Sequence, residues 1–250
     1  MKALITGASS GIGRDMARYL SKLGYDLIIV ARRENLLQEL KDELKNTKIT
    51  IEKMDVSNPE NCTKIFDKYP DIDILINNAG FGKFGEFDKI ELNDELNMIN
   101  TNIIGVHTLT KLYLQKMKNE NKGYILNVAS SAGLLPGGPL MATYYATKSY
   151  VVSLTRAISE ELKIDGSNVK ISALCPGPVN TNFNNVANVR FALKGLSSEY
   201  VAKYGIDNLL KGKRVIIPGW QMKLAILGAK IFPNSLVLKV TYHQQKSKRN

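Results

Sequence analysis

The stretch that decides the fold of this chain is Lys2-Ala3-Leu4-Ile5-Thr6-Gly7-Ala8-Ser9-Ser10-Gly11-Ile12-Gly13. A short apolar run leads into a glycine-rich turn, and the turn opens a segment of helical period. Glycine lets the backbone approach a ligand closely, and a helix N-terminus offers amide donors and a positive dipole. The stretch therefore predicts a strand, a turn that holds the pyrophosphate of a dinucleotide, and a helix. The alternative is a tight turn that binds no ligand. The expected contacts are Gly7, Ser9, Ser10, Gly11, Ile12 and Gly13.

The same alternation continues outward from this turn. Short β-branched runs alternate with longer amphipathic segments, which predicts an α/β fold in which a parallel sheet carries helices on both faces. Strands are expected near residues 2–6, 25–31, 48–53, 73–76, 123–129, 168–175 and 213–217, and the clearest helices over 11–23, 33–45, 92–118 and 142–165. No linker-like stretch or internal repeat interrupts the pattern, so we expect one domain over residues 1–250.

Length and composition narrow the class of protein. A chain of 250 residues with 44% hydrophobic residues can bury one sizeable core. Cys62 and Cys175 are too few for a disulfide framework. The strand expected at residue 2 leaves no room for a secretory signal, which favours the cytoplasm. His107 has no cysteine or carboxylate companions at ligand spacing, so we expect no metal site.

The net charge of +11 is compatible with a polyanionic partner, a membrane surface or a generally lysine-rich composition. Lysines are spread along the chain, and no basic stripe is interleaved with aromatic residues. We therefore expect no nucleic-acid partner. The one concentrated cluster is Lys246, Lys248 and Arg249, which is typical of a solvated terminus.

The end of the second strand indicates which dinucleotide is bound. NAD-specific sites carry an acidic residue there, which accepts hydrogen bonds from the adenosine ribose. This chain instead has Ala31, followed by Arg32 and Arg33. Guanidinium groups suit a 2′-phosphate, so NADP is expected in preference to NAD. Alternatively, the two arginines only begin a solvated helix.

Two further strand ends contribute to the same crevice, because ligands of open α/β sheets bind at the carboxyl ends of the strands. Asp55 and Val56 follow the third strand and are expected at the adenine edge. The fourth strand is followed by a turn that consists of Asn78, Ala79 and Gly80.

Tyr144 and Lys148 carry the chemistry that the sequence predicts. On a helix, residues four apart share a face, so the Lys148 ammonium group can lie near the Tyr144 hydroxyl and lower its pKa. Such a phenol can exchange a proton with a substrate near neutral pH. The hydroxyl of Ser131 could hold a carbonyl oxygen against it. The same spacing recurs at Tyr242 and Lys246 in the charged tail, where we assign it no function.

Several motifs together resemble the short-chain dehydrogenase/reductase family, in its order and spacing. They are Thr6–Gly13, Asp55-Val56, Asn77–Gly80, Asn100–Gly105, Ser130–Gly133, Tyr144-x-x-x-Lys148 and Cys175–Thr181. The resemblance implies a single Rossmann-type doubly wound parallel sheet of about seven strands. It also implies a homodimer or homotetramer.

The resemblance further implies a catalytic tetrad, which consists of Asn102, Ser131, Tyr144 and Lys148. Family spacing selects Ser131 over Ser130, because it lies thirteen residues before the tyrosine. Tyr144 would protonate a carbonyl oxygen that Ser131 polarises, and Lys148 would bind the nicotinamide ribose. Asn102 would tie a water molecule to Lys148. The nicotinamide end is expected to meet Pro176, Gly177, Val179 and Thr181.

The C-terminal third is expected to determine the substrate. Residues 182–211 occupy the place of the family's variable substrate loop and lid. Apolar residues there, with four others, could form a lipophilic pocket wall, although ordinary core packing is an equal alternative. They are Phe183, Val186, Val189, Phe191, Leu193, Phe81, Phe84, Leu134 and Leu135.

Residues 219–250 form an apolar extension with a basic tail. It is too short and too charged to span a bilayer. It could cover the pocket, pack against a second subunit or lie on a membrane surface, and the first two are favoured over the membrane.

Taken together, the residues predict an NADP(H)-dependent oxidoreductase that interconverts a small-molecule carbonyl compound and an alcohol. A non-catalytic NADP-binding regulatory module is one alternative. A membrane-peripheral reductase of a lipid intermediate is another.

Overall fold

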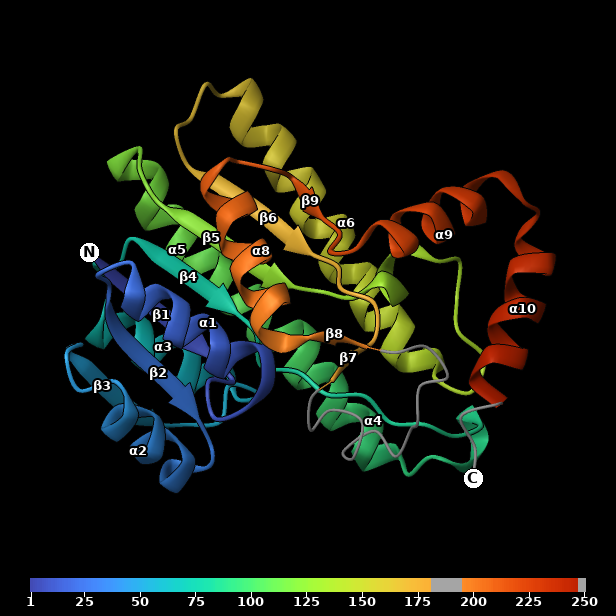
Figure 1. Cartoon of the computed structure of the whole chain (residues 1–250), viewed down its shortest axis with the longest axis horizontal. Coiled ribbons are helices and arrows are strands. Elements are labelled where there is room, and N and C mark those ends of the chain that lie inside the picture. The colour runs from blue at the N-terminus through green and yellow to red at the C-terminus, as the bar shows by residue number, and fades with distance from the viewer. Residues whose placement is uncertain (181–194, 247–250) are drawn as a thin grey trace.

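The computed structural model describes residues 1–180 and 195–246, and a parallel sheet of seven strands lies at its centre (Figure 1). The strand order is β3-β2-β1-β4-β5-β6-β9. The strands are β1 (Lys2–Thr6), β2 (Asp26–Ala31), β3 (Ile49–Lys53), β4 (Ile74–Asn77), β5 (Tyr124–Val128), β6 (Lys170–Leu174) and β9 (Val215–Ile216). The predicted α/β class and Rossmann-type sheet are confirmed, and each strand lies within its expected range or one residue beyond it.

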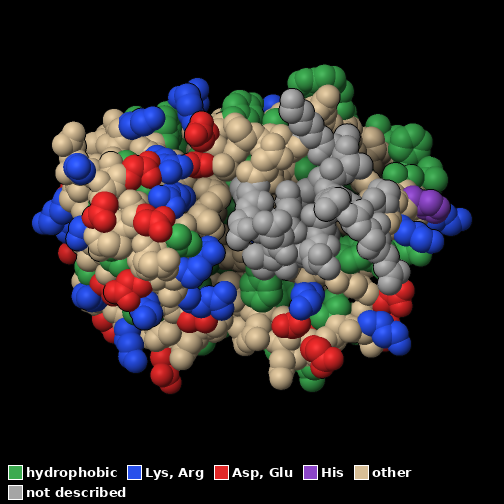
Figure 2. Space-filling view, turned by 60° about the horizontal axis from the view of Figure 1, so that its bottom comes forward, with side chains coloured by type: hydrophobic (Ala, Val, Ile, Leu, Met, Phe, Trp, Pro, Cys, Tyr) green, Lys and Arg blue, Asp and Glu red, His purple; other side chains and the backbone are tan. Residues whose placement is uncertain are grey.

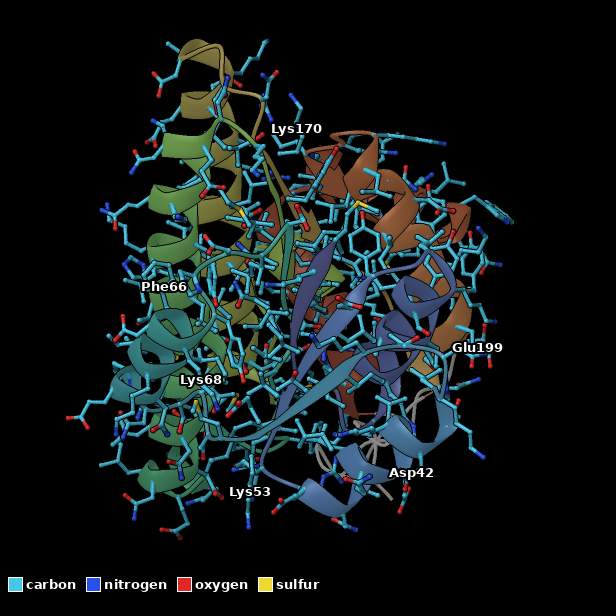
Figure 3. The ribbon with its side chains drawn as sticks, turned by 90° about the vertical axis from the view of Figure 1, so that its left-hand side faces the viewer. Asp42, Lys53, Phe66, Lys68, Lys170 and Glu199 are labelled. Atoms are coloured by element: carbon cyan, nitrogen blue, oxygen red, sulfur yellow. The ribbon has the colours of Figure 1, made fainter. Side chains whose placement is uncertain are left out.

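Both faces of the sheet are covered by helices, which explains why its strands are apolar at nearly every position. Successive strand residues point to opposite faces, so Ile5 and Ile29 enter one core cluster while Leu4 and Ile28 enter the other. In Figure 3, Phe66 and Lys68 lie to one side of the sheet, and Asp42 and Glu199 to the other. The first side holds α3 (Pro59–Lys68), α5 (Val106–Glu120) and α6 (Ala142–Ile164). The second holds α1 (Gly11–Lys22), α2 (Glu34–Glu43) and α8 (Ser198–Leu210).

The segment expected as one helix over 92–118 is divided in the structure. It consists of α4 (Leu92–Ile99), the π-helical segment η2 (Asn100–Gly105) and α5. Gly105 packs so tightly on the backbone of Val56 that a Cβ atom would lie 2.4 Å from the Val56 oxygen. A contact of this kind, between segments far apart in the sequence, cannot be predicted from the spacing of hydrophobic residues along one helix. Two short 3-10 segments complete this half, η1 (Phe87–Lys89) and η3 (Ser131–Leu134).

The structure describes only part of the predicted substrate loop and lid over 182–211. Residues 181–194, which include most of the predicted apolar wall, lie outside the described residues. The remainder contains β8 (Leu196–Ser197), which pairs with β7 (Val179–Asn180), and the core helix α8. Val201, Ile206 and Leu209 of α8 are fully buried in the core cluster that also contains Ile5 of β1. A helix with this burial belongs to the core and not to a lid.

The chain continues from β9 into α9 (Trp220–Ile231) and α10 (Asn234–Lys246), which lie at the right-hand end of the molecule in Figure 1. Within the described ranges, no helix combines the length and the apolar character that crossing a membrane requires.

Leu209→Ala tests whether α8 is part of the core. Because Leu209 is 0% exposed, its truncation should lower the free energy of unfolding by about 2–5 kcal/mol. The matched change Leu227→Ala on α9, where the side chain is 57% exposed, should change it by less than about 0.5 kcal/mol. Urea unfolding followed by circular dichroism measures both, and equal effects would contradict the assignment of α8.

Candidate active site

A cavity of about 530 Å³ opens at the carboxyl ends of the central strands and gathers most of the predicted site residues. Asn102 and Gly13 do not line it, because both are packed behind its wall. Thr181 lies outside the described residues. The predicted residues that line the cavity are Gly7, Ser9, Ser10, Gly11, Ile12, Arg32, Arg33, Asp55, Val56, Asn78, Ala79, Gly80, Ser131, Tyr144, Lys148, Pro176, Gly177 and Val179.

The floor of the cavity is a junction between the ends of β1 and β4. The Thr6 hydroxyl accepts hydrogen bonds from the backbone N–H groups of Asn78 (3.0 Å) and Ala79 (3.1 Å). In return, the Asn78 amide donates to the backbone oxygens of Thr6 and Gly7. Gly13 must be glycine here, because a Cβ atom would lie 2.3 Å from the Asn78 Nδ2 atom. The glycine turn is thus held against β4, at the switch point of the strand order.

Arg33 reaches back from the end of β2 to the glycine turn. Its Nη2 atom donates to the hydroxyls of Ser9 (3.0 Å) and Ser10 (2.8 Å). Arg32 points instead toward Asp55, and its Nη1 atom lies 3.6 Å from the Asp55 Oδ2 atom. Arg33 therefore forms a cluster of one cation and two hydroxyls, which is suited to an anionic group.

Lys148 is the buried cation of the site. It lies on the inner face of α6 and is 5% exposed, and its Nζ atom donates to the Val128 oxygen at the end of β5 (3.0 Å). Burial disfavours the ammonium form, so the pKa of Lys148 falls from its ordinary value of 10.5 to about 8. The side chain is still mostly charged at neutral pH.

Asn102 supports Lys148 from behind the cavity wall. Its Oδ1 atom accepts from the Phe81 backbone N–H (3.1 Å), and its Nδ2 atom donates to the Phe81 oxygen (2.9 Å) and the Thr147 hydroxyl (3.1 Å). Gly80 fits between the two side chains, because a Cβ atom there would lie 2.9 Å from Asn102 Oδ1 and 3.2 Å from Lys148 Nζ. The structure thus joins η2, the turn after β4 and α6 at one point.

The electrostatics of Tyr144 differ from the prediction. Lys148 was expected to lower the pKa of the phenol, but burial raises that pKa from its ordinary value of 10 to about 12. The Lys148 Nζ atom lies 5.9 Å from the centre of the Tyr144 ring, and one of its three N–H groups donates to the Val128 oxygen. The phenol therefore keeps its proton at neutral pH and can donate it.

The hydroxyl that hydrogen-bonds the Tyr144 phenol is that of Ser130, and the bond offsets part of the rise in its pKa. The predicted serine was Ser131, which was expected to hold the carbonyl oxygen of a substrate against the phenol. Ser130 has an extended backbone and caps η3, where its Oγ atom accepts from the Ala132 N–H (3.1 Å). Ser131 is the first residue of η3, so the two serines differ in backbone conformation. Ser131 also lines the cavity, and its backbone N–H donates to the Pro176 oxygen (2.8 Å).

The rest of the cavity wall is apolar and comes partly from residues that the sequence analysis did not identify. Of the predicted wall, Phe81 and Leu135 line the cavity, whereas Phe84 and Leu134 pack beside it. The C-terminal helices add a side that was not assigned to particular residues, which consists of Met222, Ala225, Ile226, Gln244 and Gln245. The Gln245 amide donates to the Tyr145 hydroxyl (2.8 Å), which fastens α10 beside the Tyr144 helix. The apolar run over residues 219–232 is the sequence feature from which this side of the cavity wall could have been predicted.

The arrangement therefore combines three functions in one cavity. A glycine turn and Arg33 can bind an anionic nucleotide, and a neutral phenol with a serine hydroxyl can meet a carbonyl oxygen. A buried ammonium group lies beside them. No other part of the described chain brings these groups together.

Comparisons with known proteins agree with this geometry. The family model for short chain dehydrogenases matches residues 1–190. An NADP-dependent 3-hydroxy acid dehydrogenase of Schizosaccharomyces pombe is 38% identical over 195 residues, which cover 73% of each chain.

Two solved structures show the same fold. A short-chain dehydrogenase from Sphingobium yanoikuyae in complex with NADPH has a TM-score of 0.82 at 26% identity, and the match covers 92% of this chain and 93% of that one. A short chain dehydrogenase/reductase from Burkholderia phymatum in complex with NAD also has a TM-score of 0.82 at 26% identity, with 100% and 95% covered. Since the family model matches well over half of its residues, the chain belongs to the short-chain dehydrogenase/reductase family of oxidoreductases.

Proposed function

We propose that this protein reduces a ketone or aldehyde to an alcohol with NADPH, or catalyses the reverse oxidation. The observation that carries the proposal is the neutral Tyr144 phenol, hydrogen-bonded to Ser130 and placed beside the buried Lys148 ammonium group. The donors of the glycine turn and Arg33 fit a dinucleotide. When bound, the nicotinamide supplies the hydride that reaches the carbonyl carbon.

The side chains of this protein would handle the proton and the oxygen. Tyr144 donates its proton to the carbonyl oxygen, which becomes the alcohol hydroxyl, and the Ser130 hydroxyl donates a hydrogen bond to the same oxygen. Lys148 stabilises the phenolate that remains, because its Nζ atom lies 5.9 Å from the centre of that ring. All polar atoms of the Asn102 side chain contact protein, so we assign it a positioning role through Phe81 and Thr147.

Arg33 supports NADP as the preferred cofactor. Its guanidinium group donates hydrogen bonds to the hydroxyls of Ser9 and Ser10. Because Ala31 stands at the end of β2, the site lacks the acidic residue of NAD-specific enzymes. A 2′-phosphate placed there would accept from three donors. The Schizosaccharomyces pombe relative is NADP-dependent by name.

The cavity wall favours a lipophilic carbonyl compound. Phe81, Leu135, Met141, Met222 and Ile226 surround the side that is away from the glycine turn. Apolar side chains bind an apolar substrate body by removing its surface from water, while Ser130 and Tyr144 fix the carbonyl oxygen.

Ser130→Ala tests both the reaction and the choice of serine. The intact protein should oxidise NADPH, measured by its absorbance, with members of a panel of lipophilic ketones and aldehydes. Loss of one oxyanion donor should lower kcat by about 10²–10³-fold, whereas Ser131→Ala should lower it by less than about threefold. No turnover with any member of the panel would contradict the reaction. A larger loss in Ser131→Ala would contradict the assignment of Ser130.

Arg33→Ala tests the cofactor. Removal of a charge-assisted contact with the phosphate should raise the Kd of NADPH by about 10–100-fold and leave that of NADH nearly unchanged. Arg32→Ala is the matched control, and because Arg32 is directed at Asp55 we expect a smaller effect. Titration of cofactor fluorescence measures the Kd of both cofactors for the intact protein and for the two variants. An equal loss of both cofactors would show that Arg33 supports the fold of the turn and not the phosphate.

A further inference from the structure

The outward face of α9 is a stripe of exposed apolar side chains. Trp220, Leu224, Leu227 and Ile231 lie at intervals of three and four residues, so they share one face of the helix, and each is more than half exposed. The opposite face is occupied, because Ile226 is buried and lines the cavity with Met222 and Ala225. The exposed stripe is therefore not needed to close the core or the cavity.

The stripe continues onto α10. Phe232, Leu236 and Val240 are exposed at 56%, 46% and 60%. The other side of α10 is fixed to the molecule, since Val237, Thr241 and Gln245 are buried. We call the seven exposed residues of the two helices the C-terminal apolar face. They are Trp220, Leu224, Leu227, Ile231, Phe232, Leu236 and Val240. Hydrophobic side chains gather along the upper right edge of Figure 2, where α9 and α10 lie.

The segment of the chain that carries this face has charges of one sign only. All 23 acidic residues lie at or before Asp207, whereas nine of the 34 Lys and Arg follow it. Residues 208–250 thus carry +9 of the net charge of +11, and the first 207 residues are nearly neutral. Lys223 and Lys230 flank the stripe on α9, and Lys239 lies on the exposed side of α10. Lys223 has a neutral partner, the Tyr204 hydroxyl (3.3 Å).

We infer that the C-terminal apolar face docks on the surface of an anionic lipid bilayer. An exposed apolar stripe with a tryptophan and flanking lysines is the pattern of a helix that lies in the interface plane, where apolar side chains enter the acyl boundary and lysines meet anionic headgroups. A second copy of the chain is a poorer partner, because the lysines beside the stripe (Lys223, Lys230 and Lys239) would meet those of the other copy, and charged residues are depleted from interface cores. This inference concerns location and does not depend on the proposed reaction.

Docking would place α9 between the bilayer and the cavity. Its outer face carries the exposed apolar stripe, and its inner face lines the cavity. The sequence favours packing against the pocket or a second subunit for this extension. The structure assigns the inner face of α9 to the cavity and leaves the outer face exposed, which is why the two roles are compatible.

Vesicle flotation of the full-length protein tests the inference without any assay of turnover. The protein should float with vesicles of phosphatidylcholine and phosphatidylglycerol, and far less with phosphatidylcholine alone. Ile231→Glu should lower the partition coefficient by about tenfold or more, because it puts a charge of the wrong sign into the stripe. Ile164→Glu is the matched control, because the Ile164 side chain is 78% exposed and that of Ile231 is 74% exposed. Ile164 is the last residue of α6 and lies about 30 Å along this helix from Tyr144.

Thermal unfolding and NADPH binding should be alike in the two variants, since neither side chain is buried or lines the cavity. Equal flotation of the two variants, or no flotation of the intact protein with anionic vesicles, would overturn the inference. A fall in molecular mass by light scattering that is confined to Ile231→Glu would overturn it as well, because it would identify the face as a subunit contact.

Discussion

Burial of the Lys148 ammonium group is the constraint on which the rest of the site depends. A buried cation is costly unless it is hydrogen-bonded, and the hydrogen-bond acceptor that meets Lys148 is the Val128 oxygen at the end of β5. That contact fixes α6 on the sheet with Tyr144 one turn before the lysine. It also requires glycine at position 80, where Asn102 and Lys148 approach the backbone together. Three distant segments of the chain thus meet at one charge.

The same low-polarity surroundings set the protonation states. Burial raises the pKa of the Tyr144 phenol to about 12 and lowers that of Lys148 to about 8. At neutral pH the pair therefore consists of a neutral proton donor and a nearby cation. A reductase needs this combination, because the phenol must give up a proton as the carbonyl oxygen becomes negative, and the cation stabilises the phenolate left behind.

The sheet was predictable because most of its strands are short apolar runs buried on both faces, and this leaves a pattern in the sequence. The strand ends could be predicted from this pattern, and most of the predicted site residues at those ends line the cavity. The contact between Ser130 and the Tyr144 phenol was not predicted, because the family spacing selects Ser131 and the sequence does not show how the loop 135–141 folds between the serines and Tyr144. The break in the helix over 92–118 and the pKa of Tyr144 depend on contacts across the fold. The burial of α8 was visible in the spacing of Val201, Ile206 and Leu209, but the resemblance had already assigned that segment to a lid.

The most direct test of this account is the pH dependence of kcat for carbonyl reduction at saturating NADPH, from about pH 6 to about pH 10. The pKa of Lys148 is lowered to about 8 and that of Tyr144 is raised to about 12, so raising the pH through about 8 removes the ammonium charge while the phenol keeps its proton. We predict that kcat falls as the pH rises through this value. A kcat that stays constant over the whole range would contradict the claim that the buried cation assists the proton transfer.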